Sequence, residues 1–159
     1  MKLYLIGMPG CGKSTLGKKL ASRLGYSFID MDSYIEKKMG MFVEEIFTNY
    51  GEDYFRALEV KTLVEFRELD NVIIATGGGV IKNKANKSIM DGKCVFLEVP
   101  LDELEKRLSK SNIVRPLLKT NTVYDLYEER KALYDYFTDI KVSNVNVDEA
   151  IDKIMEALK

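Results

Sequence analysis

Short apolar runs alternate along the chain with longer segments in which apolar residues recur at helical spacing. The runs cover residues 3–6, 26–29, 72–75 and 95–99, with a weaker candidate at 140–147. Strands of a parallel sheet have this composition because helices cover both of their faces. The alternation of apolar runs and helical segments therefore predicts an α/β protein with about five strands.

Helical periodicity is found in five segments between and after these runs. The first of them ends before Gly25, a residue favoured just beyond a helix C-terminus. A chain of 159 residues is long enough for one sizeable core and short for two, so we expect a single domain over residues 1–159. The predicted helices are 13–24, 52–69, 102–108, 123–137 and 147–158.

A polar connection, residues 109–121, separates two of the predicted helices. It contains Ser, Asn, Lys, Arg and Pro and only two apolar pairs. Connections of this length are often lids or binding loops, although the composition also fits a solvated linker. We expect a lid here.

Composition narrows the range of functions. Lys and Arg number 24 against 25 for Asp and Glu, so no overall field favours nucleic acid as a partner. The chain contains no His, so proton transfer near neutral pH falls to a carboxylate, Lys, Tyr or Cys. Two unpaired cysteines suit a reducing compartment, and the N-terminal apolar run is too short for a signal peptide or a membrane span. We expect a cytoplasmic protein without a membrane partner.

The strongest motif is a phosphate-binding loop with the pattern G-x-x-x-x-G-K-[ST], which lies between a predicted strand and a predicted helix. Glycines let backbone N–H groups turn toward phosphates, and the helix that follows presents its positive end. Lys13 would then contact the β- and γ-phosphates, Ser14 would bind Mg²⁺, and Thr15 would reach the α-phosphate. The predicted ATP-binding residues of the loop are Gly10, Cys11, Gly12, Lys13, Ser14 and Thr15.

The loop alone does not identify the reaction, because switches, motors, transporters and small-molecule kinases share it. Asp30 and Asp32 follow the second run, where we expect both carboxylates at the end of a strand. One could hold Mg²⁺, a role we give to Asp30, while Asp32 accepts the proton of an attacking hydroxyl. Capping of the next helix is the alternative, and both could hold.

Arg56 and a glycine run supply further candidates. Arg56 lies near the start of the predicted helix 52–69, three residues before Glu59, so the Glu59 carboxylate is close enough to orient its guanidinium. A solvated surface charge is the simpler interpretation of Arg56. Three glycines, Gly77, Gly78 and Gly79, follow the third strand and would let a ligand approach closely, unless they form only a flexible turn.

Taken in order and spacing, these motifs resemble the shikimate kinase family over residues 2–136. That resemblance implies a three-layer α/β/α fold with a five-stranded parallel sheet, like the P-loop nucleoside-monophosphate kinases. It implies ATP and shikimate as substrates, Mg²⁺ as cofactor and phosphorylation of the 3-hydroxyl in aromatic amino-acid biosynthesis. The motifs are residues 7–15, Asp30-x-Asp32, Glu45-Ile46-Phe47, Gly51-Glu52-x-x-Phe55-Arg56-x-x-Glu59, Gly77 to Gly79, Val114-Arg115-Pro116-Leu117-Leu118 and Arg130-x-x-Leu133-Tyr134.

The resemblance also implies roles for single residues. Asp32 would bind the acceptor hydroxyl as base, Arg56 and Arg130 would hold the substrate carboxylate, and the three glycines would line the ring. A small helical segment, about 32–60, would bind this substrate, with Phe47 and Phe55 at the ring edge or simply in the core. Arg115, in the lid at 109–121, would close onto the phosphates, so that Lys13, Asp32 and Arg115 are the predicted catalytic residues.

Other interpretations stay open at this point. Residues 142–147 lack the Arg and Pro that some family members place around adenine, so Arg107 is the candidate for stacking on the base, or a surface charge. A gluconate kinase or another small-molecule P-loop kinase would share the loop, and a nucleotide-binding module without turnover is the alternative from a different class. We expect a monomer.

Overall fold

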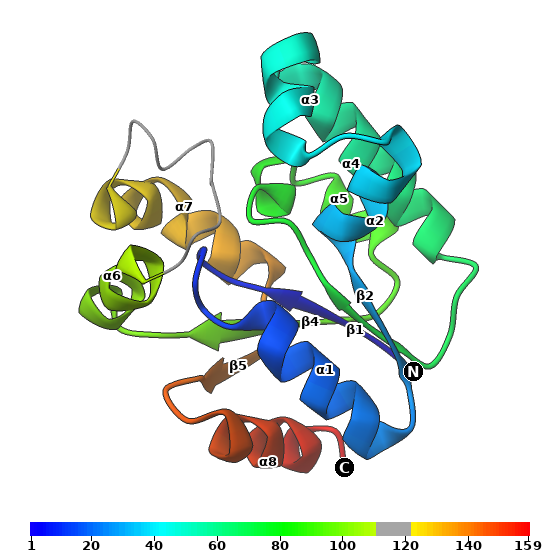
Figure 1. The fold of residues 1–159 in the computed structure, drawn as a ribbon. Helices are drawn as coiled ribbons and strands as arrows, with labels where there is room; N and C mark the ends of the chain where they lie inside the picture. The colour runs from blue at the N-terminus through cyan, green and yellow to red at the C-terminus, as the bar shows by residue number, and fades with distance from the viewer. Residues whose placement is uncertain (111–121) are drawn as a thin grey trace.

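One parallel sheet forms the centre of the computed structural model, which describes residues 1–110 and 122–159. Its five strands run in the order β2-β3-β1-β4-β5, and every neighbouring pair is parallel (Figure 1). The predicted α/β class and five-stranded parallel sheet are confirmed. The strands are β1 Lys2–Ile6, β2 Ser27–Asp30, β3 Val72–Ala75, β4 Lys93–Glu98 and β5 Ile140–Ser143.

Helices cover both faces of the sheet and give the three-layer arrangement. Helices α1 and α8 lie together on one face, and α4 and α7 lie on the other (Figure 1). Among the described residues, none of the helices is both long and apolar enough to cross a bilayer. The helices are α1 Lys13–Leu24, α2 Met31–Met39, α3 Val43–Tyr50, α4 Glu52–Phe66, α5 Asn86–Ile89, α6 Leu101–Ser109, α7 Val123–Phe137 and α8 Val147–Ala157, with a 3₁₀ turn, η1, at Val80–Lys82.

Helix α1 lies unusually close to the sheet because Gly17 has no side chain. A Cβ at Gly17 would lie 2.5 Å from Cε1 of Phe28 and 3.1 Å from Cδ1 of Leu5. Leu16 and Leu20 of the same helix are fully buried in the core. The close contact fixes the start of α1, and with it the glycine-rich loop, against the ends of the central strands.

This packing yields a prediction about stability. Alanine normally stabilises a helix relative to glycine by about 1 kcal/mol. For Gly17→Ala we expect the opposite, a net loss of about 1–2 kcal/mol in the free energy of unfolding, because the new methyl overpacks the helix–sheet contact. Urea unfolding measures this, with Lys19→Ala at an exposed position of α1 as the matched control. A stabilised Gly17→Ala variant would contradict the close approach.

Candidate active site

A large cleft of about 1130 Å³ opens along the carboxyl ends of the strands. That edge is where open α/β sheets bind ligands. The cleft collects most of the predicted site residues. It is lined by Pro9, Gly10, Gly12, Lys13, Ser14, Thr15, Asp30, Asp32, Ser33, Glu36, Phe42, Val43, Glu44, Glu45, Phe47, Phe55, Arg56, Glu59, Thr76, Gly77, Gly78, Gly79, Arg107, Leu126, Arg130, Asn144 and Val147.

One predicted residue among those described, Cys11, is not part of this lining. Arg115 and most of the predicted lid at 109–121 lie outside the described residues. Cys11 is fully buried, and its backbone N–H donates to the carbonyl oxygen of Met8 at 3.1 Å, so Cys11 shapes the turn of the loop from behind.

The phosphate-binding loop has the backbone that its glycines permit. Gly10 and Gly12 have φ values of 83° and 94°, in the left-handed region where a side chain is strained. Gly12 is also the N-cap of α1, whose first N–H groups point out of the helix start. The Nζ of Lys13 donates to the carbonyl oxygen of Gly7 at 2.8 Å, which keeps the ammonium at the loop. The loop can bind an anion such as a polyphosphate.

Ser14 and Asp30 meet at the start of α1. The Ser14 hydroxyl donates to Oδ2 of Asp30 at 2.5 Å, while Oδ1 of Asp30 accepts from the N–H of Ser33 at 3.1 Å and caps α2. The capping role considered for Asp30 is therefore confirmed, while its role in holding Mg²⁺ stays a prediction. A hydroxyl and a carboxylate beside a phosphate loop are oxygen donors of the kind that Mg²⁺ binds, so these residues fit the metal.

Asp32 does not lie on a strand. Strand β2 ends at Asp30 and helix α2 begins at Met31, so the expectation that both carboxylates lie at the end of a strand is wrong for Asp32. Capping by Asp30 starts the helix at once and places Asp32 in its first turn. Oδ1 of Asp32 instead points at Gly77, where a Cβ would be 2.7 Å away.

The environment of Asp32 changes its acidity. Burial raises the pKa of its carboxyl from 3.8 to about 6, and the neighbouring Asp30 carboxylate adds to the rise, while Lys13 acts in the opposite direction. Oδ1 has no hydrogen-bond partner among the described residues. A half-buried carboxylate with a raised pKa and a buried oxygen that lacks a described partner can accept a proton from a hydroxyl near neutral pH.

Arg56 is held by two carboxylates on its own helix. Its Nη1 lies 2.6 Å from Oε1 of Glu59, and its Nε and Nη2 each lie 3.2 Å from Oε2 of Glu52. The predicted orientation of Arg56 by Glu59 is confirmed, and Arg56 is not a solvated charge. Lys82 completes the group with an ion pair to Glu52 at 3.0 Å. The i, i+4 spacing of Glu52 and Arg56 could have predicted their contact from the sequence, whereas nothing in the sequence indicated Lys82.

Arg130 enters the same pocket from α7. It is almost completely buried, and its Nη1 donates to the carbonyl oxygen of Gly78 at 2.8 Å. The guanidinium of Arg56 lies next to Gly79, where a Cβ would be 2.3 Å from its Cζ. The two cations therefore meet the same run of glycines, in a geometry that suits one carboxylate ligand.

Phe47 and Phe55 line the cleft beside Arg56. Their ring centroids are 5.1 Å apart, and the Cζ of Arg56 lies 5.8 Å and 5.5 Å from the two rings. Phe55 is buried, whereas Phe47 is only partly buried. Their contact with a substrate ring stays a prediction.

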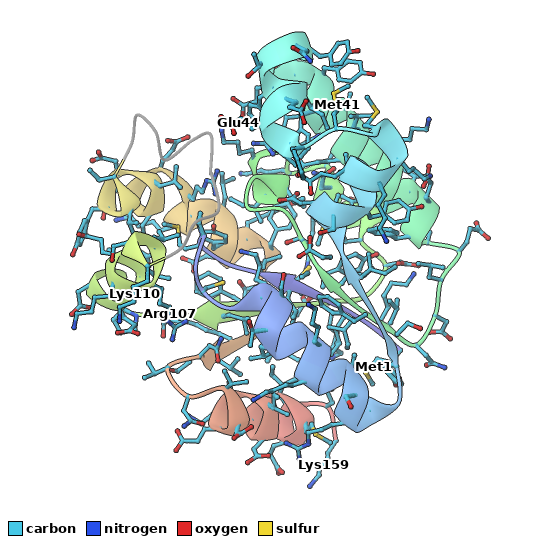
Figure 2. All side chains as sticks on the ribbon, viewed as in Figure 1. Met1, Met41, Glu44, Arg107, Lys110 and Lys159 are labelled. Carbon is cyan, nitrogen blue, oxygen red and sulfur yellow. The ribbon has the colours of Figure 1, made fainter. Side chains whose placement is uncertain are left out.

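The far end of the cleft contains Arg107 of α6, labelled in Figure 2. Its guanidinium donates to the carbonyl oxygens of Gly10 at 3.3 Å and Asn144 at 3.0 Å, and it pairs with Glu103. Arg107 is therefore half-buried and bonded to the loop, and its stacking on the base stays a prediction. Sequence reasoning missed Asn144, which carries no motif of its own.

Together, the phosphate loop, the sheet order and a buried and a half-buried arginine in the same cleft define a P-loop kinase of a small anionic acceptor. Comparison with known proteins gives the family. The family model described as "Shikimate kinase" matches residues 9–159. The chain belongs to the shikimate kinase family, which confirms the resemblance seen in the motifs and makes the protein an ATP-dependent kinase.

Individual relatives agree with this assignment over nearly the whole chain. A shikimate kinase of Clostridium botulinum (strain Alaska E43 / Type E3) is 40% identical, over 99% of this chain and 96% of that protein. The crystal structure of shikimate kinase from Bacteroides thetaiotaomicron has a TM-score of 0.89 at 34% identity, covering 99% and 98% of the two chains. Shikimate kinase from Acinetobacter baumannii in complex with shikimate has a TM-score of 0.91 at 31% identity, covering 99% and 92%.

Because the pKa of Asp32 is raised, we predict that replacing this carboxyl increases stability and lowers activity. A carboxyl whose pKa is raised on folding stabilises the fold only while it is protonated, so that stability is lost as the pH rises from about 4 through about 6. Asp32→Asn should therefore be more stable than the natural protein at pH 8, on the order of 2–3 kcal/mol, and by about half as much at pH 5. Its turnover should fall at least about 100-fold.

Urea unfolding at both pH values, without nucleotide or metal, measures the stability difference. A difference that is the same at pH 5 and pH 8 would show that burial does not perturb this carboxyl.

Proposed function

We propose that the protein transfers the γ-phosphoryl group of ATP to the 3-hydroxyl of shikimate. One observation carries the proposal: Arg56 and Arg130 meet at the glycine run beside Asp32, in the cleft that also contains the phosphate loop. Such a pocket offers a cyclic hydroxy acid two cations for its carboxylate and a base for its hydroxyl. The Acinetobacter baumannii relative, whose structure contains shikimate, supports the same acceptor.

ATP binds with its phosphates in the glycine-rich loop. The N–H groups at the start of α1 and the ammonium of Lys13 stabilise the β- and γ-phosphates. Mg²⁺ would be held by Ser14 and Asp30, together with phosphate oxygens and water, and would neutralise charge on the phosphates. Arg115 contributes a further positive charge from the segment 109–121, a role that rests on the family resemblance alone.

The acceptor binds in the other half of the cleft. Arg56 and Arg130 hold its carboxylate, and Gly77, Gly78 and Gly79 lie along its ring. The segment 32–60, which contains α2, α3 and the start of α4, forms the outer wall, with Phe47 and Phe55 at the ring edge.

Phosphoryl transfer then needs one proton acceptor. The 3-hydroxyl attacks the γ-phosphorus as Asp32 removes its proton, and the bond to the β–γ bridging oxygen breaks to release ADP. Binding in a partly buried cleft limits water as a competing nucleophile. Asp32, still an anion at pH 7 to 8, is in the form that this step requires.

We also propose that the enzyme acts as a single-domain monomer in the cytoplasm, without nucleic acid. The near balance of 24 basic and 25 acidic residues supports the absence of a polyanionic partner. The two cysteines, Cys11 and Cys94, are both buried free thiols, in keeping with a reducing compartment.

Release of ADP from Mg·ATP tests the proposed acceptor. Parallel reactions contain shikimate, shikimate methyl ester, gluconate or no acceptor. We expect rapid turnover with shikimate only, and a loss of about 10- to 100-fold in kcat/KM with the ester, because an ester cannot make charge-assisted bonds to two arginines.

Equally slow release of ADP in all four reactions would contradict shikimate as the acceptor but would not contradict ATP binding. Preference for gluconate would assign the chain to the alternative kinase. Binding of ATP without turnover on any acceptor would favour the non-catalytic module.

A further inference from the structure

Asn144 joins the end of β5 to the phosphate-binding loop, although the two are far apart in sequence. Its Nδ2 donates to the carbonyl oxygen of Cys11 at 2.7 Å. The side chain lies directly behind the loop, because a Cβ on Gly12 would be 2.6 Å from that same nitrogen. Asn144 is almost completely buried.

The backbone of Asn144 is fixed from two directions. Its N–H donates to the carbonyl oxygen of Glu98 at 2.8 Å, which continues the pairing of β5 with β4. Its own carbonyl oxygen accepts from Nη2 of Arg107 at 3.0 Å, and Nη1 of the same arginine reaches the carbonyl oxygen of Gly10 at 3.3 Å. Figure 2 shows Arg107 on α6, the helix that supplies this second attachment.

The hydrogen bond to Cys11 controls the direction of one N–H group. In a planar trans peptide the C=O of one residue and the N–H of the next point in opposite directions. When Asn144 holds the Cys11 carbonyl outward, the N–H of Gly12 turns toward the inside of the loop. No hydrogen bond of the Gly12 N–H to another described residue is seen.

A purely structural role accounts poorly for this asparagine. Its Oδ1 is buried without a hydrogen-bond partner among the described residues, which costs stability. A small apolar residue would avoid that cost and would also remove the contact that, together with the positive φ of Gly12, disfavours a side chain there. What the Asn144 amide adds, and an apolar residue lacks, is the N–H donor to the Cys11 carbonyl oxygen.

We propose that Asn144 is a positioning residue for the nucleotide: it orients the peptide between Cys11 and Gly12 so that the Gly12 N–H is ready for a phosphate oxygen. Arg107 assists by holding the preceding carbonyl and the backbone of Asn144. The inference rests on the proposed binding of ATP in this loop and adds the residue that orients one of its peptide groups. Asn144 touches no reacting atom and is not a catalytic residue.

Asn144→Ala and Asn144→Ser test this role against Asn146→Ala. The control residue lies two positions further on, and its side chain caps α8 through the N–H of Glu149 at 3.0 Å. Titration calorimetry with Mg·ADP and initial rates with shikimate give the readouts, and thermal unfolding gives the stability of each variant.

We expect Asn144→Ala to weaken Mg·ADP binding and raise the KM for ATP by about five- to tenfold, with the KM for shikimate unchanged. Asn144→Ser, which keeps a hydroxyl donor, should recover part of this loss. Asn146→Ala should lower the melting temperature and leave both KM values unchanged.

Two results would overturn the inference while leaving the proposed function intact. One is natural Mg·ADP affinity in Asn144→Ala. The other is an equal weakening of Mg·ADP binding in Asn146→Ala and Asn144→Ala when both variants lose the same amount of melting temperature. The effect on binding would then follow from lower stability alone. A natural protein that binds no Mg·ADP would overturn the proposed function together with the inference.

Discussion

The acceptor half of the cleft depends on a balance of charges held away from bulk water. Arg56 and Arg130 supply two cations, and Asp32 and Glu59 supply two anions, all within one pocket. Isolated, any of these groups would be costly to bury. Burial raises the pKa of Glu59 to about 7, while the ion pair with Arg56 acts against the rise. Arg130 is fixed by the carbonyl of Gly78 and makes no ion pair with another described residue, so its guanidinium is available to an anionic ligand.

The glycine run after β3 is a consequence of this balance. A Cβ at Gly77 would lie 2.7 Å from both Oδ1 of Asp32 and Oε2 of Glu59, and one at Gly79 would collide with Arg56. The expectation that these glycines simply make room for a ligand is therefore incomplete. Much of the space they leave is occupied by the protein's own charged groups, which lets side chains from α2 and α4 converge at the end of one strand.

Local patterns in the sequence predicted much of the fold. The bounds of α1 and α7 agree with the predicted segments 13–24 and 123–137, because both have a clear apolar periodicity and Gly25 ends α1. The phosphate loop and the Arg56–Glu59 pair were also predictable, since both depend on residues close together in the chain.

The sequence could not indicate features that depend on distant contacts. Asp32 was assigned to a strand because nothing local shows that the cap at Asp30 starts a helix at once. Lys82 reaches Glu52 across 30 positions, and Asn144 reaches Cys11 across 133. Neither Lys82 nor Asn144 belongs to a recognisable motif, and only the folded arrangement of strand ends brings them to the site.

In the proposed reaction, the pocket places the 3-hydroxyl of shikimate, and no other nucleophile, next to Asp32 and the γ-phosphate. Identification of the product by ³¹P and ¹H NMR after a reaction of the purified protein with Mg·ATP and shikimate tests this most directly. The account predicts one new phosphate monoester whose phosphorus couples to the proton on C3. Phosphate on a different hydroxyl, or inorganic phosphate alone, would contradict it.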